Sequence, residues 1–328
     1  MGQREIAGIG VTEIDRGGRR YAYPLDYPNL ERIEASIQLS ASHDDGEVEG
    51  LKVDPDSYAA QDAYFSTGKA QSPDFVKAMA EVIDPRFDAL LSDVLADERK
   101  VDTLRRMGDH LATGGNIVNA VPHGPLLDIG LQHAMAFVGL SRLGYRFTIG
   151  IVISHGVAGR GKRFNDDLVC LADALDWACD RVWYVTPQTP KTRQSSYAEV
   201  VSAEHIQHRN AIVRADIAAA QDEGGILITV APSATSIRTD SHGTHWLEAP
   251  TLGTMRLMSH PKTQVAIAVG RVLGAATPSY DLVPEFLTLD SDVDELSSQA
   301  DELMARMVEG MRLADPGERY EIGRPPRA

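Results

Sequence analysis

Apolar residues follow two periods in turn along the chain, and the order of the segments predicts an α/β fold. Five apolar runs have the length of strands, at 116–121, 147–154, 181–186, 225–231 and 264–269. Segments with helical spacing separate several of these runs, at 126–143, 166–179 and 198–223. Strands that alternate with helices build a sheet covered by helices, so we expect a central mixed sheet flanked by helices.

Helical spacing also marks the regions on either side of this alternating part. Between residues 73 and 112 the apolar positions predict two or three helices, with a break at Asp84-Pro85 because proline ends a helix. From residue 290 onward a single apolar stripe predicts a helix that packs on a core. The stripe consists of Val293, Leu296, Ala300, Leu303, Met304, Met307, Val308 and Met311.

The first 60 residues follow neither period clearly. They contain two Tyr-Pro pairs and an acidic segment at 43–49, which are typical of irregular structure. We therefore expect three parts in the chain. These are an irregular extension over 1–60 that wraps the main domain, an N-terminal helical subdomain over 61–112, and an α/β domain over 113–328.

Composition and net charge limit the kinds of molecule that the protein is expected to bind. The 328 residues are 43% hydrophobic and 24% charged, as in a folded enzyme, and the formal net charge of −15 argues against non-specific binding of nucleic acid. No apolar stretch reaches the roughly 20 residues that span a bilayer, and the first residues lack the pattern of a signal peptide. With only two cysteines, we expect a soluble cytoplasmic protein without a transmembrane segment.

The segment 114–128 carries the most specific chemistry. Pro122 ends an apolar run and is followed by His123, and Asp128 lies five positions further on. At a strand-to-helix junction a neutral imidazole can take a proton, while a carboxylate fixes its tautomer and steadies the imidazolium. His123 and Asp128 are therefore candidates for a catalytic pair that deprotonates a hydroxyl.

A second candidate site follows the apolar run at 147–154. Residues 156–163 combine glycines with Arg160, Lys162 and Arg163, and they nearly spell the phosphate-binding loop of nucleotide triphosphatases. Arg163 stands where that loop needs a hydroxyl residue to hold magnesium, which argues against nucleotide hydrolysis. Backbone N–H groups of glycines together with these cations still favour a generic anion site.

Four segments in this order resemble the H-x4-D acyltransferase family, and especially its soluble, plastid-type glycerol-3-phosphate acyltransferases. The matching blocks are 122–128, 159–164, 226–233 with its Ala-Pro-Ser end, and 264–269. The third block departs from the soluble relatives, in which two glycines lead into an arginine-rich stretch. Here Ala-Thr-Ser-Ile follows instead, so only Arg238 matches that stretch.

The resemblance implies transfer of an acyl group from a thioester to a hydroxyl acceptor such as glycerol 3-phosphate. His123 and Asp128 would form the general-base pair, without a covalent intermediate. The donor would be acyl-CoA or the phosphopantetheinyl arm of an acyl carrier protein, with no further cofactor, no metal and no nucleic acid. Binding of the acceptor or of a donor phosphate is implied for Arg160, Lys162, Arg163, Ser233 and Arg238.

Two alternatives remain open. One is a module that binds acyl chains or carrier proteins and has kept the fold but lost turnover. The other is a metal-dependent hydrolase, because several histidines are spaced so that pairs of them can face one metal ion. The residues concerned are His133, Glu204, His205, His208, Asp240, His242 and His245.

Overall fold

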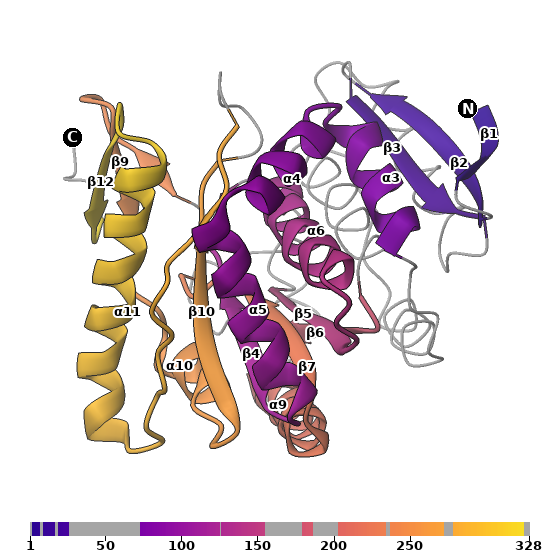
Figure 1. Cartoon of the computed structure of the whole chain (residues 1–328). Helices are drawn as coiled ribbons and strands as arrows, with labels where there is room; N and C mark the ends of the chain where they lie inside the picture. The colour runs from indigo at the N-terminus through magenta and orange to yellow at the C-terminus, as the bar shows by residue number, and fades with distance from the viewer. Residues whose placement is uncertain are drawn as a thin grey trace.

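A six-stranded sheet with helices on both faces forms the centre of the computed structural model (Figure 1). The structure describes residues 2–6, 9–16, 19–25, 73–124, 126–154, 179–185, 203–233, 237–271 and 278–324. The helices are α3 (Pro73–Ile83), α4 (Phe87–Ala96), α5 (Glu98–Ala112), α6 (Leu126–Arg142), α9 (Ala203–Glu223), α10 (Leu252–Met258) and α11 (Val293–Ala314). The strands are β1 (Gly2–Ile6), β2 (Ile9–Arg16), β3 (Arg19–Pro24), β4 (Asn116–Ala120), β5 (Thr148–Ser154), β6 (Arg181–Val185), β7 (Ile226–Val230), β8 (Arg238–Thr239), β9 (Thr244–Leu247), β10 (Thr263–Val269), β11 (Asp281–Leu282) and β12 (Arg319–Ile322).

The strand order of the central sheet is β11-β10-β4-β7-β5-β6. The neighbours from β10 to β6 run parallel, and β11 is antiparallel to β10. Each apolar run of strand length in the sequence supplies one strand of this sheet. The expected α/β class, with a central mixed sheet flanked by helices, is confirmed.

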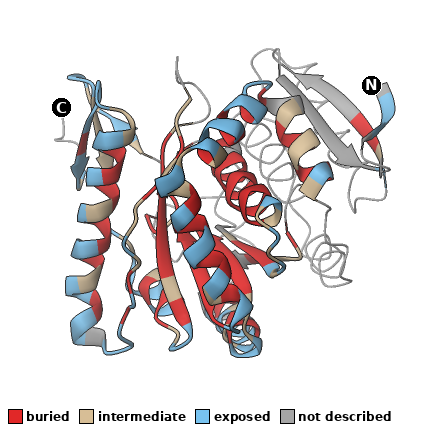
Figure 2. Cartoon of the chain, in the orientation of Figure 1, coloured by how far each residue is buried: buried red, intermediate tan, exposed pale blue. Residues whose placement is uncertain are grey.

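Each face of the sheet has its own hydrophobic core, because side chains alternate along a strand. On one face Ile117 and Val121 pack with α3, α4, α5 and α6. On the other face Val118 and Ala120 pack with α9, α10 and α11. Helix α6 is buried over most of its length, because α3, α4 and α5 cover the side that faces away from the sheet (Figure 2).

The helices agree with the sequence pattern. Three helices occupy 73–112, and the break between α3 and α4 falls at Asp84-Pro85. Phe75 of α3 and Phe87 of α4 belong to the same buried cluster as the strand residue Ile117, so these helices share the core of the sheet. Of the helix expected over 166–179, the described part of the chain contains only Cys179, a buried cysteine just before β6.

The apolar stripe near the end of the chain lies on α11, as expected. Its described side chains are buried in the core that α11 shares with the sheet: Leu296, Ala300, Leu303, Met304, Met307, Val308 and Met311. Within the ranges that the structure describes, no helix has both the length and the apolar composition needed to cross a bilayer.

The start of the chain differs from the irregular structure expected there. Strands β1, β2 and β3 form an antiparallel sheet beside α3 (Figure 1). Arg16 pairs with Arg19 across the β2–β3 hairpin, and the sequence between them is Gly-Gly, a common two-residue hairpin connection. That dipeptide was the signal for this sheet. Residues 26–72, the remainder of the expected extension and the start of the next part, lie outside the described residues.

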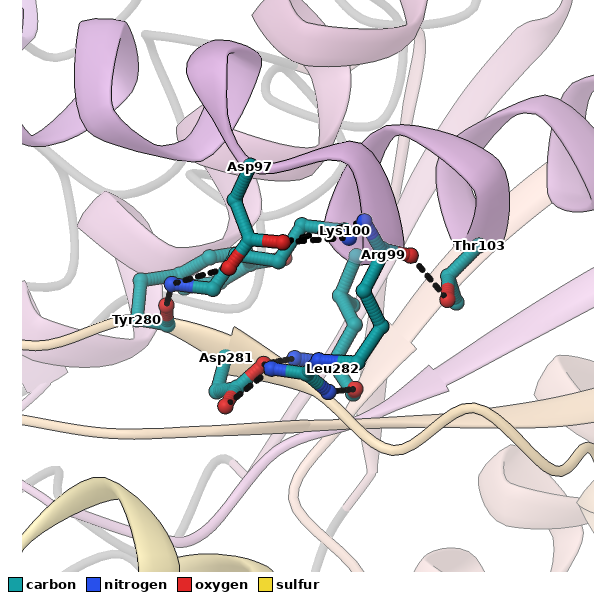
Figure 3. A network of polar contacts seen from close by, with 7 residues as sticks. All are labelled: Asp97, Arg99, Lys100, Thr103, Tyr280, Asp281 and Leu282. Atoms are coloured by element: carbon teal, nitrogen blue, oxygen red, sulfur yellow. Dashed lines mark hydrogen bonds and ion pairs between the residues drawn. The ribbon is translucent and has the colours of Figure 1, made fainter.

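The first turn of α5 is tied to β11 and to the residue before it (Figure 3). Arg99 donates to both carboxylate oxygens of Asp281, at 2.6 and 2.7 Å, and to a main-chain carbonyl of β11 at 3.2 Å. Lys100 Nζ donates to the carbonyl of Tyr280 at 2.9 Å. Asp97 caps the helix by accepting from the backbone N–H groups of Arg99 and Lys100. These bonds hold the chain that returns from β10 against α5.

Replacing Arg99 tests this tie. We expect Arg99→Ala to lower the free energy of unfolding by about 1 kcal/mol, because an ion pair to both oxygens of Asp281 and a carbonyl bond are lost together. The matched control is Arg142→Ala, which removes a single exposed ion pair to Asp74 and should cost only about 0.3 kcal/mol. Urea unfolding measures both values, and equal losses in the two variants would contradict the special role of Arg99.

Candidate functional site

The carboxyl ends of β4 and β7 lie side by side in the middle of the sheet, and the chain leaves them toward opposite faces. After β4 it enters α6 on one face, and after β7 it continues through β8 and β9 to α10, which packs on the other face. Such a reversal is the usual place of a ligand in a parallel α/β sheet. His123 follows β4 and Ser233 follows β7, so both candidates lie at this edge.

Backbone hydrogen bonds bring the end of β7 to His123. The N–H group of Val121 donates to the carbonyl of Val230 at 3.0 Å, which continues the pairing of the two strands. The N–H group of Ile237 then donates to the carbonyl of His123 at 2.8 Å. Arg238, the next residue, begins β8, so the chain that follows the third sequence block passes beside the candidate base.

The hydrogen bond of the His123 ring defines its tautomer. Nδ1 lies 3.0 Å from the carbonyl oxygen of Gly124. A carbonyl only accepts, so Nδ1 carries the proton and Nε2 is the acceptor nitrogen of the neutral ring. Burial lowers the pKa of His123 below its ordinary value, although the bond to Gly124 opposes part of that effect. The ring is therefore neutral near pH 7, with Nε2 able to take a proton.

Asp128 lies in the first turn of α6 and is buried. Its Oδ2 is 3.4 Å from Nε2 of Gln132, one turn further along the helix. A Cβ atom on Gly124 would lie 2.9 Å from the same oxygen, so the carboxylate occupies the space beside Gly124. Within the described part of the chain no hydrogen bond joins His123 to Asp128. The sequence predicted that this carboxylate would fix the tautomer of His123, and the Gly124 carbonyl fixes it instead.

The residues expected to bind substrate have different surroundings. Ser233 is completely buried, and its Oγ has no hydrogen-bond partner. Arg238 is exposed and lies 3.6 Å from Oε1 of Glu248. Arg160, Lys162 and Arg163 follow β5 in the sequence and lie outside the described residues.

Several buried polar side chains besides Ser233 have atoms without a hydrogen-bond partner. They include both amide atoms of Asn119, Oε1 of Gln132 and the hydroxyl of Tyr280. Burial without a partner raises the pKa of the Tyr280 hydroxyl, so it stays protonated. Buried polar atoms are normally paired in folded proteins, so this group of unpaired atoms is unusual.

The sequence reasoning missed Gln132 and Gly124, which surround the Asp128 carboxylate. For Gln132 a signal existed, because residues four apart lie on the same side of a helix. For Gly124 no signal existed, because the need for a residue without a Cβ atom depends on where the carboxylate of Asp128 lies in space.

Two described histidines of the metal-hydrolase alternative, His133 and His245, contact other side chains. His133 lies in the core, where Nδ1 bonds to the hydroxyl of Thr229 and Nε2 lies 3.5 Å from Sγ of Cys179. His245 Nε2 lies 3.2 Å from Glu318. A search of the described residues found no group of three or more His, Cys, Asp or Glu side chains that could hold a metal ion.

The lowered pKa of His123 predicts a pH dependence of stability. Between its pKa in the folded protein and the unfolded value of about 6.5, the unfolded chain binds more protons, so the free energy of unfolding falls as the pH is lowered through this range. We expect His123→Gln to remove part of this fall. His208→Gln, on an exposed residue of α9, is the control. Urea unfolding from about pH 8 to about pH 5 measures the effect, and equal slopes for native protein and His123→Gln would contradict it.

In comparisons with known proteins, the chain matches no family model and no curated sequence.

Proposed function

We propose that the chain is an acyltransferase that moves an acyl group from an acyl-CoA or acyl-carrier-protein thioester to a hydroxyl acceptor such as glycerol 3-phosphate. The observation that carries this proposal is the His123 ring, which has Nδ1 on the Gly124 carbonyl and Nε2 left as a proton acceptor. A general base at neutral pH needs this neutral form. The resemblance of residues 122–128 to the H-x4-D motif supports the choice of reaction.

The proposed reaction uses this geometry. Nε2 of His123 takes the proton of the acceptor hydroxyl while that oxygen attacks the thioester carbonyl. The tetrahedral intermediate collapses, the C–S bond breaks, and the leaving thiolate takes the proton from the imidazolium. The carbonyl of Gly124 and the nearby carboxylate of Asp128 stabilise the imidazolium in the meantime. The cycle requires no covalent acyl-enzyme.

The first turn of α6 supports stabilisation of the oxyanion. The opening N–H groups of a helix have no partner within it, and the aligned dipoles of this 17-residue helix place partial positive charge there. An oxyanion that develops beside His123 would gain from both effects.

We assign the acceptor phosphate to Arg238, because its neighbour Ile237 is bonded to His123. Its ion pair with the largely buried Glu248 is long, at 3.6 Å, and the Arg238 side chain is itself exposed, so a dianionic phosphate can compete for the guanidinium. Arg160, Lys162 and Arg163 stay proposed as ligands of the donor or acceptor phosphates. Ser233, at the end of the third sequence block, stays proposed as a further substrate-binding residue. We place the reaction in the cytoplasm on the evidence of cysteine usage.

Thiol release from a panel of acyl-CoA and acyl-carrier-protein thioesters, with and without glycerol 3-phosphate, tests this function. We expect release by the native chain, and a loss of about 100-fold or more in kcat/KM for His123→Ala, since the general base is gone. His208→Ala is the control and should keep full activity.

The outcomes separate the alternatives. Release that needs both His123 and glycerol 3-phosphate supports the proposal with its acceptor, and dependence on another alcohol supports acyl transfer with a different one. Release that His123→Ala leaves unchanged would contradict the proposed mechanism. Binding of the thioesters without any release would indicate an acyl-binding module.

A further inference from the structure

Gln132 contacts the Asp128 carboxylate from one turn further along α6. The Gln132 side chain is completely buried. Its Nε2 lies 3.4 Å from Oδ2 of Asp128 and 3.4 Å from the carbonyl oxygen of Gly270. An amide nitrogen carries two hydrogens, so one side chain can donate to both acceptors.

The two acceptors fix the orientation of the Gln132 amide. With the amide turned over, Oε1 would face a carboxylate and a carbonyl, neither of which can donate. In the observed orientation Oε1 has no hydrogen-bond partner. A substitution that keeps the shape of Gln132 and replaces only Nε2 therefore breaks these two bonds and no others.

Gly270 gives Gln132 a rigid anchor. It follows β10 with a φ of +135°, and a Cβ atom there would lie 2.3 Å from the carbonyl oxygen of Ser279. The chain that returns from Gly270 pairs with β10 through β11, which Arg99 of α5 holds in place. Through Gln132, the first turn of α6 is thus connected to the carboxyl end of β10.

Gly124 also limits the position of the Asp128 carboxylate. Any side chain at Gly124 would bring a Cβ atom to 2.9 Å from Oδ2, the oxygen that Gln132 contacts. The carbonyl of the same Gly124 holds Nδ1 of His123. Gly124 is therefore in contact with both groups, with the imidazole through its carbonyl and with the carboxylate through its Cα side.

We propose that Gln132 is a positioning residue, which holds the Asp128 carboxylate against Gly124, the residue whose carbonyl contacts the His123 ring. This inference rests on the proposed function for its catalytic consequence. Both bonds of Gln132 are long, at 3.4 Å, and both go to groups of the protein. Gln132 therefore places the charge of Asp128 and does not bind the substrate. Its loss should lower kcat and leave KM nearly unchanged, because the carboxylate acts when the imidazolium forms.

Gln132→Glu is the sharpest test, because it keeps the shape, removes both N–H donors and sets a second carboxyl group against Asp128, where like charge makes one of the two carboxyls take up a proton. In the thiol-release assay we expect kcat to fall about 10- to 100-fold, with KM changed by less than about threefold. The matched control is Gln221→Glu. Gln221 is also buried, and its Nε2 also donates to two acceptors, Leu257 O and Thr263 Oγ1, but at the opposite end of β10. That variant should lose stability and keep its kcat per folded molecule. A native kcat for Gln132→Glu would overturn the proposal.

An exchange of the two groups tests the contact without relying on activity. In the double variant Asp128→Asn/Gln132→Glu, the new amide at 128 can donate to the new carboxylate at 132. We expect a higher melting temperature than the two single losses would give by addition, while kcat stays low because the charge is in the wrong place. Additive losses would overturn the contact. If the native chain releases no thiol, the proposed function fails and the catalytic role of Gln132 fails with it, whereas the melting temperatures still decide the contact.

Discussion

The burial of α6 between the sheet and α3, α4 and α5 is the constraint on which the site depends. A helix covered on both sides cannot send its polar side chains to water, so those groups must find partners inside the protein. Asp128 and His133 of this helix therefore face Gln132 and Thr229, respectively. The same burial lets polar groups interact strongly, because the surrounding dielectric is low.

At the candidate base His123, a main-chain carbonyl has the role that the sequence predicted for a side chain. The sequence suggested that a carboxylate would fix the tautomer of His123, and a main-chain carbonyl of the neighbouring residue does so instead. A carbonyl carries no net charge, so it orients the imidazole without strongly raising its affinity for protons. The neutral ring can then take a proton. The carboxylate of Asp128, which lies against Gly124, would stabilise the imidazolium once the proton has arrived.

Local pattern was enough to predict the elements of the central sheet and the long helices around it. The apolar run before Pro122 is β4, and the late stripe that ends at Met311 is α11, because both segments bury one continuous apolar surface. Short strands such as β8 and β11 left no such signal, since two residues do not show a period. At the site, the sequence indicated which side chains have useful chemistry. It could not indicate that Gly270, which lies far along the chain, would accept a bond from Gln132, because that contact depends on how β10 and α6 are placed in space.

The position of β10 also affects when the fold can form during synthesis. β10 pairs directly with β4, although β4 leaves the ribosome long before it. The return of the chain through Asp281 then engages Arg99 of α5, a helix made even earlier. A nascent chain that ends before these segments has one unpaired side of β4, and an open strand edge invites pairing with other chains. The candidate base His123 is therefore synthesised early, but its surroundings are complete only when most of the chain has emerged.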